Sequence, residues 1–362
     1  MVNMVICLVS LAFYKIAFSS IELPSDVIVP KISGIRTISV EKSDGLYFYM
    51  FSGSIDASRF SSNMMIKSPK SIRFSNTFYY PPDRSYYGMA YFEDPTNNNK
   101  LVIIFGGIGL DGVYGDIWAY NIDMDIWKKF DFELPEPCYD FAYTSFIDPI
   151  TNKTIIVISG GLNNMNTYVN KAYKCIIEDK YCELIKSLED CFDYGIVGAE
   201  LLYIDDYLLL FSGYYYYRSN ESDNIVINRA ICQINLIENS IHLILTDSTG
   251  AFNGGSCYYN NSIYSFFGFT YYDYIKKIES IYITDIIDFI PTKISIKCPK
   301  DLECARGSFA ISCNENNVTI LGGISKSGPT NSYFTIDLDI LEVVDYKEEL
   351  NYPSPRAFAS LS

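Results

Sequence analysis

The sequence contains a single histidine, His242, and no Cys-x-x-Cys pair among its 362 residues. Zinc sites are usually built from several Cys and His ligands at short spacings, so a zinc centre here would need thiolates scattered along the chain. Nucleophilic catalysis by a Ser/His/Asp or Cys/His group would have to use His242, and no motif marks a partner for it. No P-loop or dinucleotide-binding fingerprint occurs. These absences argue against a metal-dependent, nucleotide-dependent or histidine-based enzyme, and we expect no cofactor.

Basic residues are also scarce. The chain has 28 Lys and Arg against 43 Asp and Glu, which gives a formal net charge of −15. No basic stripe offsets this charge, so nucleic acid and anionic membranes are poor candidates as partners. A protein partner, in particular one of basic character, or a glycan fits this surface better. The sequence leaves the oligomeric state open.

Long apolar runs are missing except at the N-terminus. Residues 1–20 contain an apolar stretch as long as a signal-peptide core, with small residues at Ala17, Ser19 and Ser20 that offer a cleavage site. The segment has no basic residue at its start and is interrupted by Lys15, which leaves an uncleaved anchor or a strand as alternatives. No second stretch is long enough to span a membrane. We expect a signal peptide over 1–20 and one domain over 21–362, secreted or in the secretory pathway, with a cytoplasmic location as the alternative.

Apolar runs that end in a glycine corner recur along the chain. Successive corners lie 52 to 55 residues apart. A strand-ending glycine with a period of about 50 residues is typical of a β-propeller, in which each unit packs only against its neighbours. The corner glycines are Gly53, Gly107, Gly161, Gly213, Gly268 and Gly323.

Each repeat contains four short strand patterns, which are clearest over residues 81–133. Runs rich in aromatic and β-branched residues cover 85–92, 101–107, 115–122 and 126–133, and turn residues separate them. No segment has the length of a stable helix. The sequence therefore predicts an all-β protein whose units are four-stranded antiparallel meanders.

The repeat at 81–133 also carries a set of residues in a recognisable order: Arg84, Gly106, Gly107, Asp116, Trp118, Tyr120 and Trp127. With this pattern the chain resembles the Kelch repeats from about Gly34 onward. Other repeats depart from it, since only three corners have a glycine pair and only this repeat has both tryptophans. The resemblance implies that the motif residues build the fold, because glycine permits positive dihedrals and close backbone approach. It also implies a non-catalytic interaction scaffold, since copper- and iron-dependent propeller relatives need histidine ligands.

The glycine corners predict six blades. Residues 352–362 resemble the first strand of a further repeat. Either this strand closes a six-bladed ring against the first blade, or the chain is a piece of a longer, seven-bladed protein. A closed ring removes exposed sheet edges, which favours the first alternative. Residues 21–32 are expected to add an outer strand to the closing blade.

Nine cysteines lie beyond the signal segment, and they predict disulfides in an oxidising compartment. Cys175 and Cys182 face each other across a strand turn, and Cys298 with Cys304 is a second candidate pair. The alternative is that the thiols are buried small apolar residues. Four N-glycosylation acceptors fall in predicted turns or loops, as suits a secreted chain. These acceptors are Asn152, Asn220, Asn260 and Asn317.

A Cys-aromatic-Asp-aromatic element occurs at 138–141 and again at 191–194, at the place that Arg84 takes in its repeat. It would bring Asp140 and Asp193 near the central channel, where two carboxylates form a site for a cation or a basic ligand. The alternative is that each aspartate hydrogen-bonds backbone at the start of its strand. Cys138 and Cys191 are also candidates for a bridge between adjacent blades. A propeller lectin or a carboxylate-based hydrolase acting at the channel is therefore the alternative function.

Partner binding is the function that remains, and the loops between the second and third strands are its expected site. These loops share one face with the segments that lead into each blade, and they vary while the strands repeat. Tyrosine and arginine, which are enriched in binding hot spots, concentrate in them. The alternative is that the tyrosines continue the strand and pack inward. The predicted partner-binding residues are Arg59, Asp111, Tyr114, Tyr214, Tyr215, Tyr216, Tyr217, Arg218, Tyr271 and Tyr272.

Overall fold

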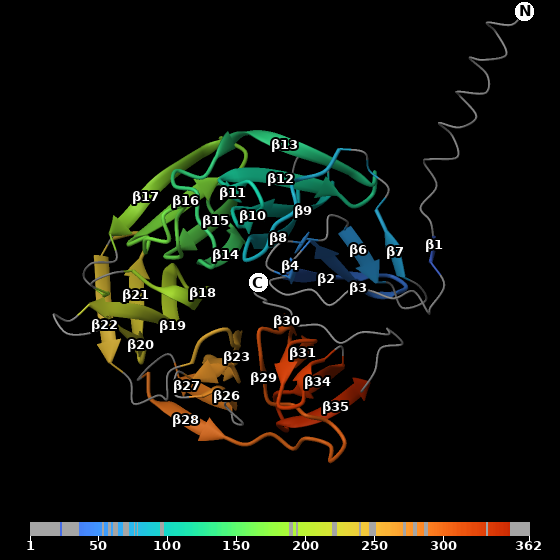
Figure 1. The fold of residues 1–362 in the computed structure, drawn as a ribbon, viewed down its shortest axis with the longest axis vertical. Coiled ribbons are helices and arrows are strands. Elements are labelled where there is room, and N and C mark those ends of the chain that lie inside the picture. The colour runs from blue at the N-terminus through green and yellow to red at the C-terminus, as the bar shows by residue number, and fades with distance from the viewer. Residues whose placement is uncertain are drawn as a thin grey trace, which may run out of the picture.

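The computed structural model describes residues 22–23, 36–52, 54–56, 59–60, 64–67, 72–75, 77, 79–94, 98–187, 191–192, 195–218, 223–238, 240–245, 251–270, 273–277, 281–285, 289–330 and 332–347. All regular elements in these residues are strands. In the part of the chain so described, no helix is long and apolar enough to cross a membrane. Small antiparallel sheets follow one another around a central axis in chain order, which is the arrangement of a β-propeller (Figure 1). The predicted all-β propeller is therefore confirmed, and the predicted signal segment at 1–20 lies outside the described residues.

Each sheet is named here after the strand nearest the axis, which is also its first strand in the chain except in the β2 sheet, where the outer strand β1 comes earlier. The β2 sheet consists of β2 (Arg36–Lys42), β3 (Gly45–Phe51), β6 (Met64–Lys67), β7 (Ile72–Phe74) and, at its outer edge, β1 (Glu22–Leu23). The β8 sheet consists of β8 (Gly88–Glu93), β9 (Lys100–Phe105), β12 (Asp116–Asn121) and β13 (Ile126–Glu133). The β14 sheet consists of β14 (Ala142–Ile147), β15 (Thr154–Ser159), β16 (Lys171–Ile176) and β17 (Tyr181–Ser187).

The remaining sheets repeat this meander. The β18 sheet consists of β18 (Val197–Ile204), β19 (Tyr207–Arg218), β21 (Ala230–Asn235) and β22 (Ser240–Leu245), with β20 (Asp223–Ile227) paired to the end of β19. The β23 sheet consists of β23 (Gly255–Tyr259), β24 (Ser262–Phe266), β27 (Ile281–Asp285) and β28 (Pro291–Ile294). The β30 sheet consists of β30 (Ala310–Asn314), β31 (Asn317–Leu321), β34 (Tyr333–Asp337) and β35 (Glu342–Lys347).

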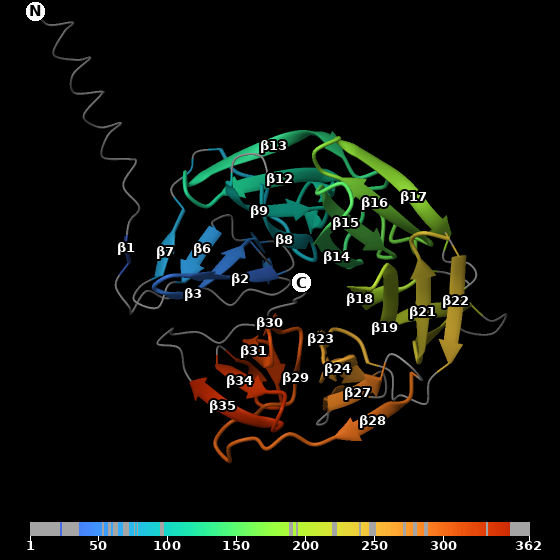
Figure 2. The ribbon, with the colours of Figure 1, turned by 180° about the vertical axis from the view of Figure 1, so that it is seen from behind.

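The inner strands lie side by side around the axis (Figure 2). β2 packs beside both β8 and β30, so the first inner strand of the described chain meets the last one. The pairing of β1 with β7 places the predicted outer strand of 21–32 in the β2 sheet, although only Glu22–Leu23 is described. The predicted closing strand at 352–362 lies outside the described residues.

Large side chains fill the space between neighbouring sheets. The ring of Phe105 on β9 lies 5.8 Å from that of Phe141 and 5.3 Å from that of Tyr143, both of which belong to the next repeat. All three are buried and share one apolar cluster with Ile103 and Ile156. Aromatic rings in such offset and edge-to-face contacts add to the energy of the buried area. The apolar core at this contact between two neighbouring sheets, called a seam here, is thus built from the side chains of two adjacent repeats.

The corner glycines join each sheet to the next through the backbone. Every described corner glycine has a positive φ, from 79° at Gly213 to 104° at Gly268. The N–H of each of four corner glycines donates to the carbonyl of the residue that leads into the next inner strand. These bonds are Gly107 to Cys138 at 2.9 Å, Gly161 to Ile196 at 2.8 Å, Gly213 to Ala251 at 2.7 Å and Gly268 to Arg306 at 3.0 Å.

A second set of backbone hydrogen bonds joins the lead-in segment of one sheet to the lead-in segment of the next. Each residue in this set has a φ between 52° and 61°. With this backbone conformation, its N–H points to one neighbouring sheet and its carbonyl to the other. Tyr86 is the first acceptor in this series and Ser308 is its last donor. The bonds run from Asp140 to Tyr86 at 2.9 Å, from Gly198 to Asp140 at 3.1 Å, from Asn253 to Gly198 at 3.3 Å and from Ser308 to Asn253 at 2.8 Å.

Replacement of a corner glycine should weaken the seam between two sheets. A Cβ on Gly161 would lie 2.7 Å from the carbonyl oxygen of Tyr139 and 2.9 Å from Cβ of Phe141, and it would require a positive φ of 89°. We expect Gly161→Ala to lower the free energy of unfolding by about 2–4 kcal/mol, measured by urea denaturation. Gly115→Ala is the control, because Gly115 lacks a positive φ and an added Cβ would lie 3.6 Å from the carbonyl oxygen of Leu134, the nearest backbone atom, and 3.1 Å from the side chain of Pro137. Equal losses in the two variants would contradict the role given to the corner.

Candidate functional site

The connections between the second and third strands fold back as hairpins on one face of the ring. Figure 1 looks onto this face. In the β14 sheet, the connection makes an isolated bridge between Leu162 and Tyr168 in place of a strand pair. The paired strands are β4 (Ser54–Asp56) with β5 (Arg59–Phe60), β10 (Ile108–Gly109) with β11 (Gly112–Val113), the end of β19 with β20, β25 (Phe269–Thr270) with β26 (Asp273–Lys277), and β32 (Ile324–Ser325) with β33 (Gly328–Pro329).

The lead-in segments pair with the bases of these hairpins. Tyr139 bridges to Leu162, and Val197 pairs with Tyr214. In the β30 sheet the lead-in residues form a short strand, β29 (Arg306–Gly307), which pairs with β32. The lead-in segments and the second-to-third connections therefore lie on one face, as the sequence predicted.

Tyr214 and Tyr215 belong to strand β19, which continues to Arg218 and pairs with β20. The connection between the second and third strands of this repeat, which the sequence analysis treated as a loop, is therefore mostly a hairpin. The ring of Tyr214 lies 5.3 Å from that of Phe252, and that of Tyr215 lies 6.2 Å from that of Phe192. Both tyrosines are half-buried and pack within the sheets, which matches the strand alternative.

Several predicted partner-binding side chains are outside the described part of the structure. For Tyr216, Tyr217 and Arg218 the strand is described but the side chains are not, and the same holds for Arg59 on β5. Tyr271 and Tyr272 lie outside the described residues altogether. Their role in binding stays a prediction.

Tyr114 and Asp111 lie on the β10–β11 hairpin and differ in exposure. Asp111 is exposed at the tip, next to Leu110, whose side chain is 68% exposed. The ring of Tyr114 is half-buried and covers the guanidinium of Arg84 at 4.4 Å. Burial and the charge of Asp111 raise the pKa of the Tyr114 hydroxyl. Tyr114 therefore packs against the buried Arg84 and stabilises the fold. Leu110 and Asp111, at the exposed tip of the same hairpin, are accessible to a partner.

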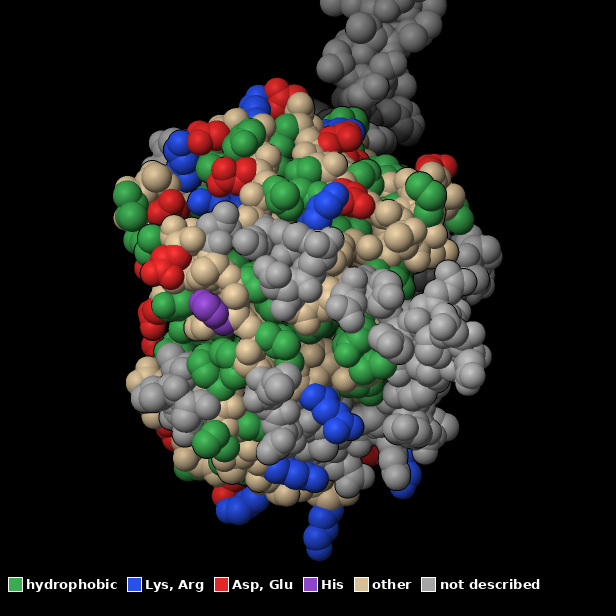
Figure 3. All heavy atoms as spheres, turned by 90° about the vertical axis from the view of Figure 1, so that its left-hand side faces the viewer, with side chains coloured by type: hydrophobic (Ala, Val, Ile, Leu, Met, Phe, Trp, Pro, Cys, Tyr) green, Lys and Arg blue, Asp and Glu red, His purple; other side chains and the backbone are tan. Residues whose placement is uncertain are grey.

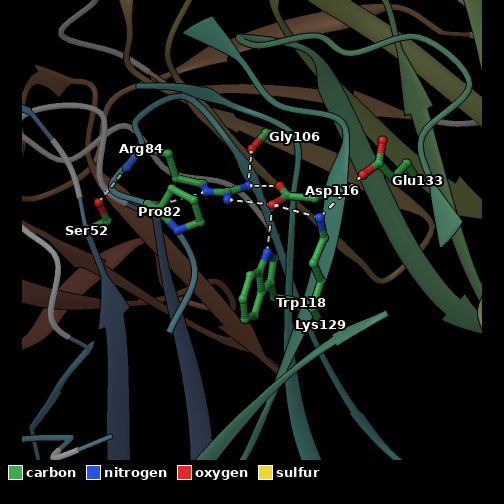
Figure 4. A network of polar contacts seen from close by, with 8 residues as sticks. All are labelled: Ser52, Pro82, Arg84, Gly106, Asp116, Trp118, Lys129 and Glu133. Atoms are coloured by element: carbon green, nitrogen blue, oxygen red, sulfur yellow. Dashed lines mark hydrogen bonds and ion pairs between the residues drawn. The ribbon is translucent and has the colours of Figure 1, made fainter. Parts of the chain in front are cut away.

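Arg84 is fully buried and anchors a polar network in the β8 sheet (Figure 4). Its guanidinium donates to Asp116 at 2.6 and 3.2 Å and to the carbonyl of Gly106 at 2.9 Å, while Trp118 Nε1 donates to Asp116 at 2.7 Å. Burial alone would raise the pKa of Asp116, but the hydrogen bonds from Arg84 and Trp118 outweigh it and hold the pKa below its usual value. These motif residues form a hydrogen-bonded network inside the β8 sheet and so stabilise the fold.

Arg306 takes the corresponding place in the β30 sheet, where its guanidinium donates hydrogen bonds to neutral oxygens and the charge of Glu303 only partly opposes the effect of burial on its pKa. Its Nη1 donates to the carbonyl of Gly322 at 2.9 Å and to the Ser332 hydroxyl at 3.1 Å, with Ser332 standing where the other repeat has Asp116. Burial lowers the pKa of this arginine. Neutral oxygens thus satisfy the guanidinium in this repeat.

Asp140 lies at the axial end of the hairpin face, in the chain of backbone bonds described above. Its side chain is half-buried, and burial raises the pKa of its carboxyl to about 6, with a smaller opposing effect of Arg36. Asp193 lies outside the described residues. The pairing of Val197 with Tyr214 corresponds to that of Tyr139 with Leu162, so the residue equivalent to Asp140 is Gly198 and not Asp193. The predicted second copy of the element is therefore out of register by five residues.

Two charged residues of the inner strands were missed by the sequence analysis. Arg36 opens β2 and pairs with Phe51, whereas Glu200 on β18 pairs with Phe211. Both partners precede a corner, so Arg36 and Glu200 occupy the same place in their sheets. The Nε of Arg36 donates to the carbonyl of Tyr87 at 2.8 Å. The shared pattern of Ile and Gly at 32–36 (I-x-G-x-R) and at 196–200 (I-x-G-x-E) would have aligned Arg36 with Glu200 from the sequence alone.

The structure contains both disulfides expected from the sequence, Cys175–Cys182 and Cys298–Cys304. It also contains Cys191–Cys232 and Cys257–Cys313, the second of which joins the inner strands β23 and β30 of neighbouring sheets. The suggested bridge between Cys138 and Cys191 is wrong, because Cys191 bonds Cys232 and Cys138 is a buried free thiol. Four disulfides indicate an oxidising environment.

The predicted glycosylation acceptors differ in their surroundings. Asn152 and Asn260 are exposed in turns between strands. Asn317 is half-buried at the start of β31, so it is not a loop residue, and its amide donates to Asn316 at 2.9 Å. Asn220 lies outside the described residues.

Several exposed turn carboxylates of the described residues lie on the face opposite the hairpins. In Figure 3, which looks at the side formed by β17 and β22, acidic side chains gather toward the left edge. His242 is the single purple side chain there, exposed on β22, the strand of its sheet farthest from the axis. The exposed turn carboxylates include those of Asp123, Glu178, Asp179, Asp205, Asp206 and Glu238.

Comparisons with known proteins add no family. Neither a protein-family model nor a curated protein matches the chain. Among the described residues, no group of three or more His, Cys, Asp and Glu side chains is placed to hold a metal ion. The functional inference therefore rests on the geometry of the hairpin face and of the inner strands.

Loss of the disulfide between sheets should weaken the ring more than loss of a hairpin disulfide. Cys257–Cys313 closes a segment of 56 residues, whereas Cys175–Cys182 closes one of 7. Chain entropy predicts a loss of about 4 kcal/mol for Cys257→Ser with Cys313→Ser and about 2 kcal/mol for Cys175→Ser with Cys182→Ser, measured by urea denaturation. The reverse order would show that the connection between β23 and β30 adds little to the ring.

Stability should also depend on the protonation of Glu200. Burial raises the pKa of its carboxyl from 4.5 to about 7, with a smaller opposing effect of the Ser256 hydroxyl. The folded state then binds more protons than the unfolded state between these values, so the free energy of unfolding falls as the pH rises from 4.5 to 7. We expect this fall to reach about 3 kcal/mol and to be absent in Glu200→Gln. Parallel pH profiles for the variant and the parent chain would refute this assignment.

Proposed function

We propose that this protein is a non-catalytic, Kelch-type propeller scaffold that binds a protein partner through its hairpin face. The observation that carries the proposal is the position of the second-to-third connections, which stand together on one face above a repeated framework. Such variable segments on a rigid support are where binding surfaces are usually found. Exposed Asp111 and the exposed apolar side chains of Leu110 and Met165 on that face supply the contact chemistry.

The scaffold that we propose has six blades. Support comes from the six glycine corners and from the inner strands β2, β8, β14, β18, β23 and β30, which follow one another around the axis. The contact between β30 and β2 leaves no described inner strand without a neighbour on either side. A ring closed in this way protects its sheet edges from other chains.

The hairpin tips of the β8 and β14 sheets are the part of the face that we assign to partner contact. Leu110 is 68% exposed and Met165 is 84% exposed. The N–H of Val113 donates to Asn164 Oδ1 at 2.8 Å, and Tyr139 donates to Asn166 Oδ1 at 2.8 Å, so the two tips are tied to each other and to the ring. Apolar side chains held rigidly above water lose little conformational entropy when a partner covers them.

The chemistry of the face favours a basic protein partner. Asp111 stands beside Leu110 at the tip, and the whole chain has a formal net charge of −15. Opposite charge on the partner increases the association rate and helps to select it. The four disulfides, which persist in oxidising compartments, support an extracellular or secretory location.

The alternative function is a propeller lectin or a carboxylate-based hydrolase acting at the channel. One observation favours it: Asp140 is a half-buried carboxyl near the axis whose pKa is raised to about 6. A general acid with a pKa near the working pH is what such a hydrolase requires. The variants below separate the two functions.

Substitutions at the hairpin tips should abolish partner binding and leave the fold intact. Partners are captured from intact cell surfaces by chemical cross-linking and identified, and each is then titrated with purified variants. We expect Leu110→Asp with Met165→Asp to weaken binding at least tenfold. Ile237→Asp, at an exposed residue in a turn of the opposite face, is the matched control and should bind as the parent does. Loss of binding or of glycan recognition only in Asp140→Asn would favour the channel function.

The location can be tested by expressing the full-length chain in a secreting cell. We expect the product in the medium, without about 20 N-terminal residues. Its mass should fall on treatment with glycosidase, and its gel mobility should change on reduction. An intracellular, unmodified product with free thiols would refute the secretory location, while the binding proposal would still be tested by the tip variants.

A further inference from the structure

Two of the predicted glycosylation acceptors occupy the same place in different sheets. Asn152 lies in the turn between β14 and β15, and Asn260 lies in the turn between β23 and β24. Both turns connect the inner strand of a sheet to its second strand. Inner strands start at the lead-in segments of the hairpin face, so they end at the opposite face, onto which Figure 2 looks. The two acceptors therefore lie on one face, in the sheets on either side of the β18 sheet.

The folded chain leaves both acceptor side chains accessible. Asn152 and Asn260 are exposed and have φ values of 54° and 47°, a region that Asn adopts more readily than most residues. The backbone N–H of Asn152 closes its turn by donating to the carbonyl of Asp148 at 2.8 Å, so the turn does not need the side chain. The residue that completes the acceptor pattern starts the second strand in both sheets, as Thr154 on β15 and Ser262 on β24.

The other two acceptors do not share these features. Asn317 is half-buried at the start of β31, and its Nδ2 donates to Asn316 at 2.9 Å. Asn220 lies outside the described residues. Within the described part of the chain, Asn152 and Asn260 are thus the acceptors that stand exposed in a turn.

An exposed apolar side chain lies two residues before each acceptor. Ile150 is 91% exposed, which makes it the most exposed large apolar side chain of the described residues. Tyr258 is 37% exposed, and its hydroxyl donates to Asn261 at 3.2 Å, so its ring lies beside the turn. An oligosaccharide is bulky and polar, so one attached at either acceptor would cover the apolar neighbour and keep the face soluble.

We propose that Asn152 and Asn260 carry N-linked oligosaccharides and that these cover the face opposite the hairpins. This modification depends on the secretory location proposed above, where the donor is an oligosaccharide held on a lipid diphosphate. The side-chain Nδ2 forms a bond to C1 of the sugar, the bond from C1 to the diphosphate oxygen breaks, and the amide gives up a proton. Carbohydrate on this face leaves the apolar tips of the β8 and β14 hairpins as the surface open to a protein partner.

The modified residues are identified by peptide mass spectrometry of the full-length chain purified from the medium of secreting cells. An amidase that releases N-glycans converts each modified Asn to Asp, and heavy-oxygen water marks the new carboxyl. We expect the mark at Asn152 and at Asn260. Ser262→Ala keeps Asn260 but removes the acceptor pattern, so Asn260 should then be unmarked. A disulfide-bonded product in the medium in which Asn152 or Asn260 is unmarked overturns the proposal and leaves the secretory location standing, whereas a product with free thiols and no mark overturns both.

Coverage of the face is measured separately, by oxidation with hydroxyl radicals before and after release of the glycans. We expect oxidation of Ile150 and Tyr258 to rise about twofold after release, because the sugar no longer shields them. Leu110, which is 68% exposed at a hairpin tip, is the control and should be oxidised equally in both samples. Equal oxidation of Ile150 in the two samples, or a rise of the same size at Leu110, would show that the glycans do not cover this face.

Discussion

The arrangement of the sheets depends on hydrogen bonds between backbones of adjacent repeats. A meander of four strands satisfies its own backbone inside the sheet, so nothing in it specifies the angle to the next sheet. The corner glycine supplies that specification, because its N–H leaves the sheet and reaches the carbonyl that precedes the next inner strand. A side chain at the corner would collide with that backbone. The repeated angle around the axis is thus set by main-chain geometry, and the apolar side chains fill what remains.

Because main-chain hydrogen bonds set the angle between sheets, the side chains around each corner can differ from repeat to repeat. In the β8 and β30 sheets a buried arginine ties the corner to the lead-in segment, and in the β18 sheet the amide of Asn228 donates to the carbonyl before the corner at 3.0 Å. The acceptor is the same backbone atom in each case, while the donor differs. The motif residues are therefore one of several solutions to a shared backbone requirement. The hairpins that follow the corner glycines take no part in these hydrogen bonds between sheets, and their sequences differ from repeat to repeat.

The strands and corners were predictable because their signals are local. Alternating apolar residues and strand-ending glycines specify a sheet edge without knowledge of the rest of the chain. The disulfide pair Cys175–Cys182 was equally local, since antiparallel pairing across a short turn brings the two residues opposite each other. Fold class and most strand positions thus followed from windows of about ten residues.

Contacts that depend on register between distant segments were not predictable in this way. The segment before β18 is five residues longer than its apparent match before β14, so Asp193 was aligned with Asp140 where Gly198 belongs. Cys191–Cys232 and Cys257–Cys313 join residues whose proximity exists only in the assembled ring. Glu200 escaped notice because one charge in an apolar strand resembles an exposed position until the neighbouring sheet is seen to cover it.

Closure of the ring also constrains the order of events during synthesis. β2 is made early and β30 late, yet the two lie side by side, and Cys313 reaches Cys257 only when the last sheet is formed. Until then the open side of the β2 sheet has no neighbour, and the growing chain presents an incomplete core to its surroundings. The bond between Cys257 and Cys313 therefore forms only after the β30 sheet has docked against the β23 sheet, in the compartment where oxidation takes place.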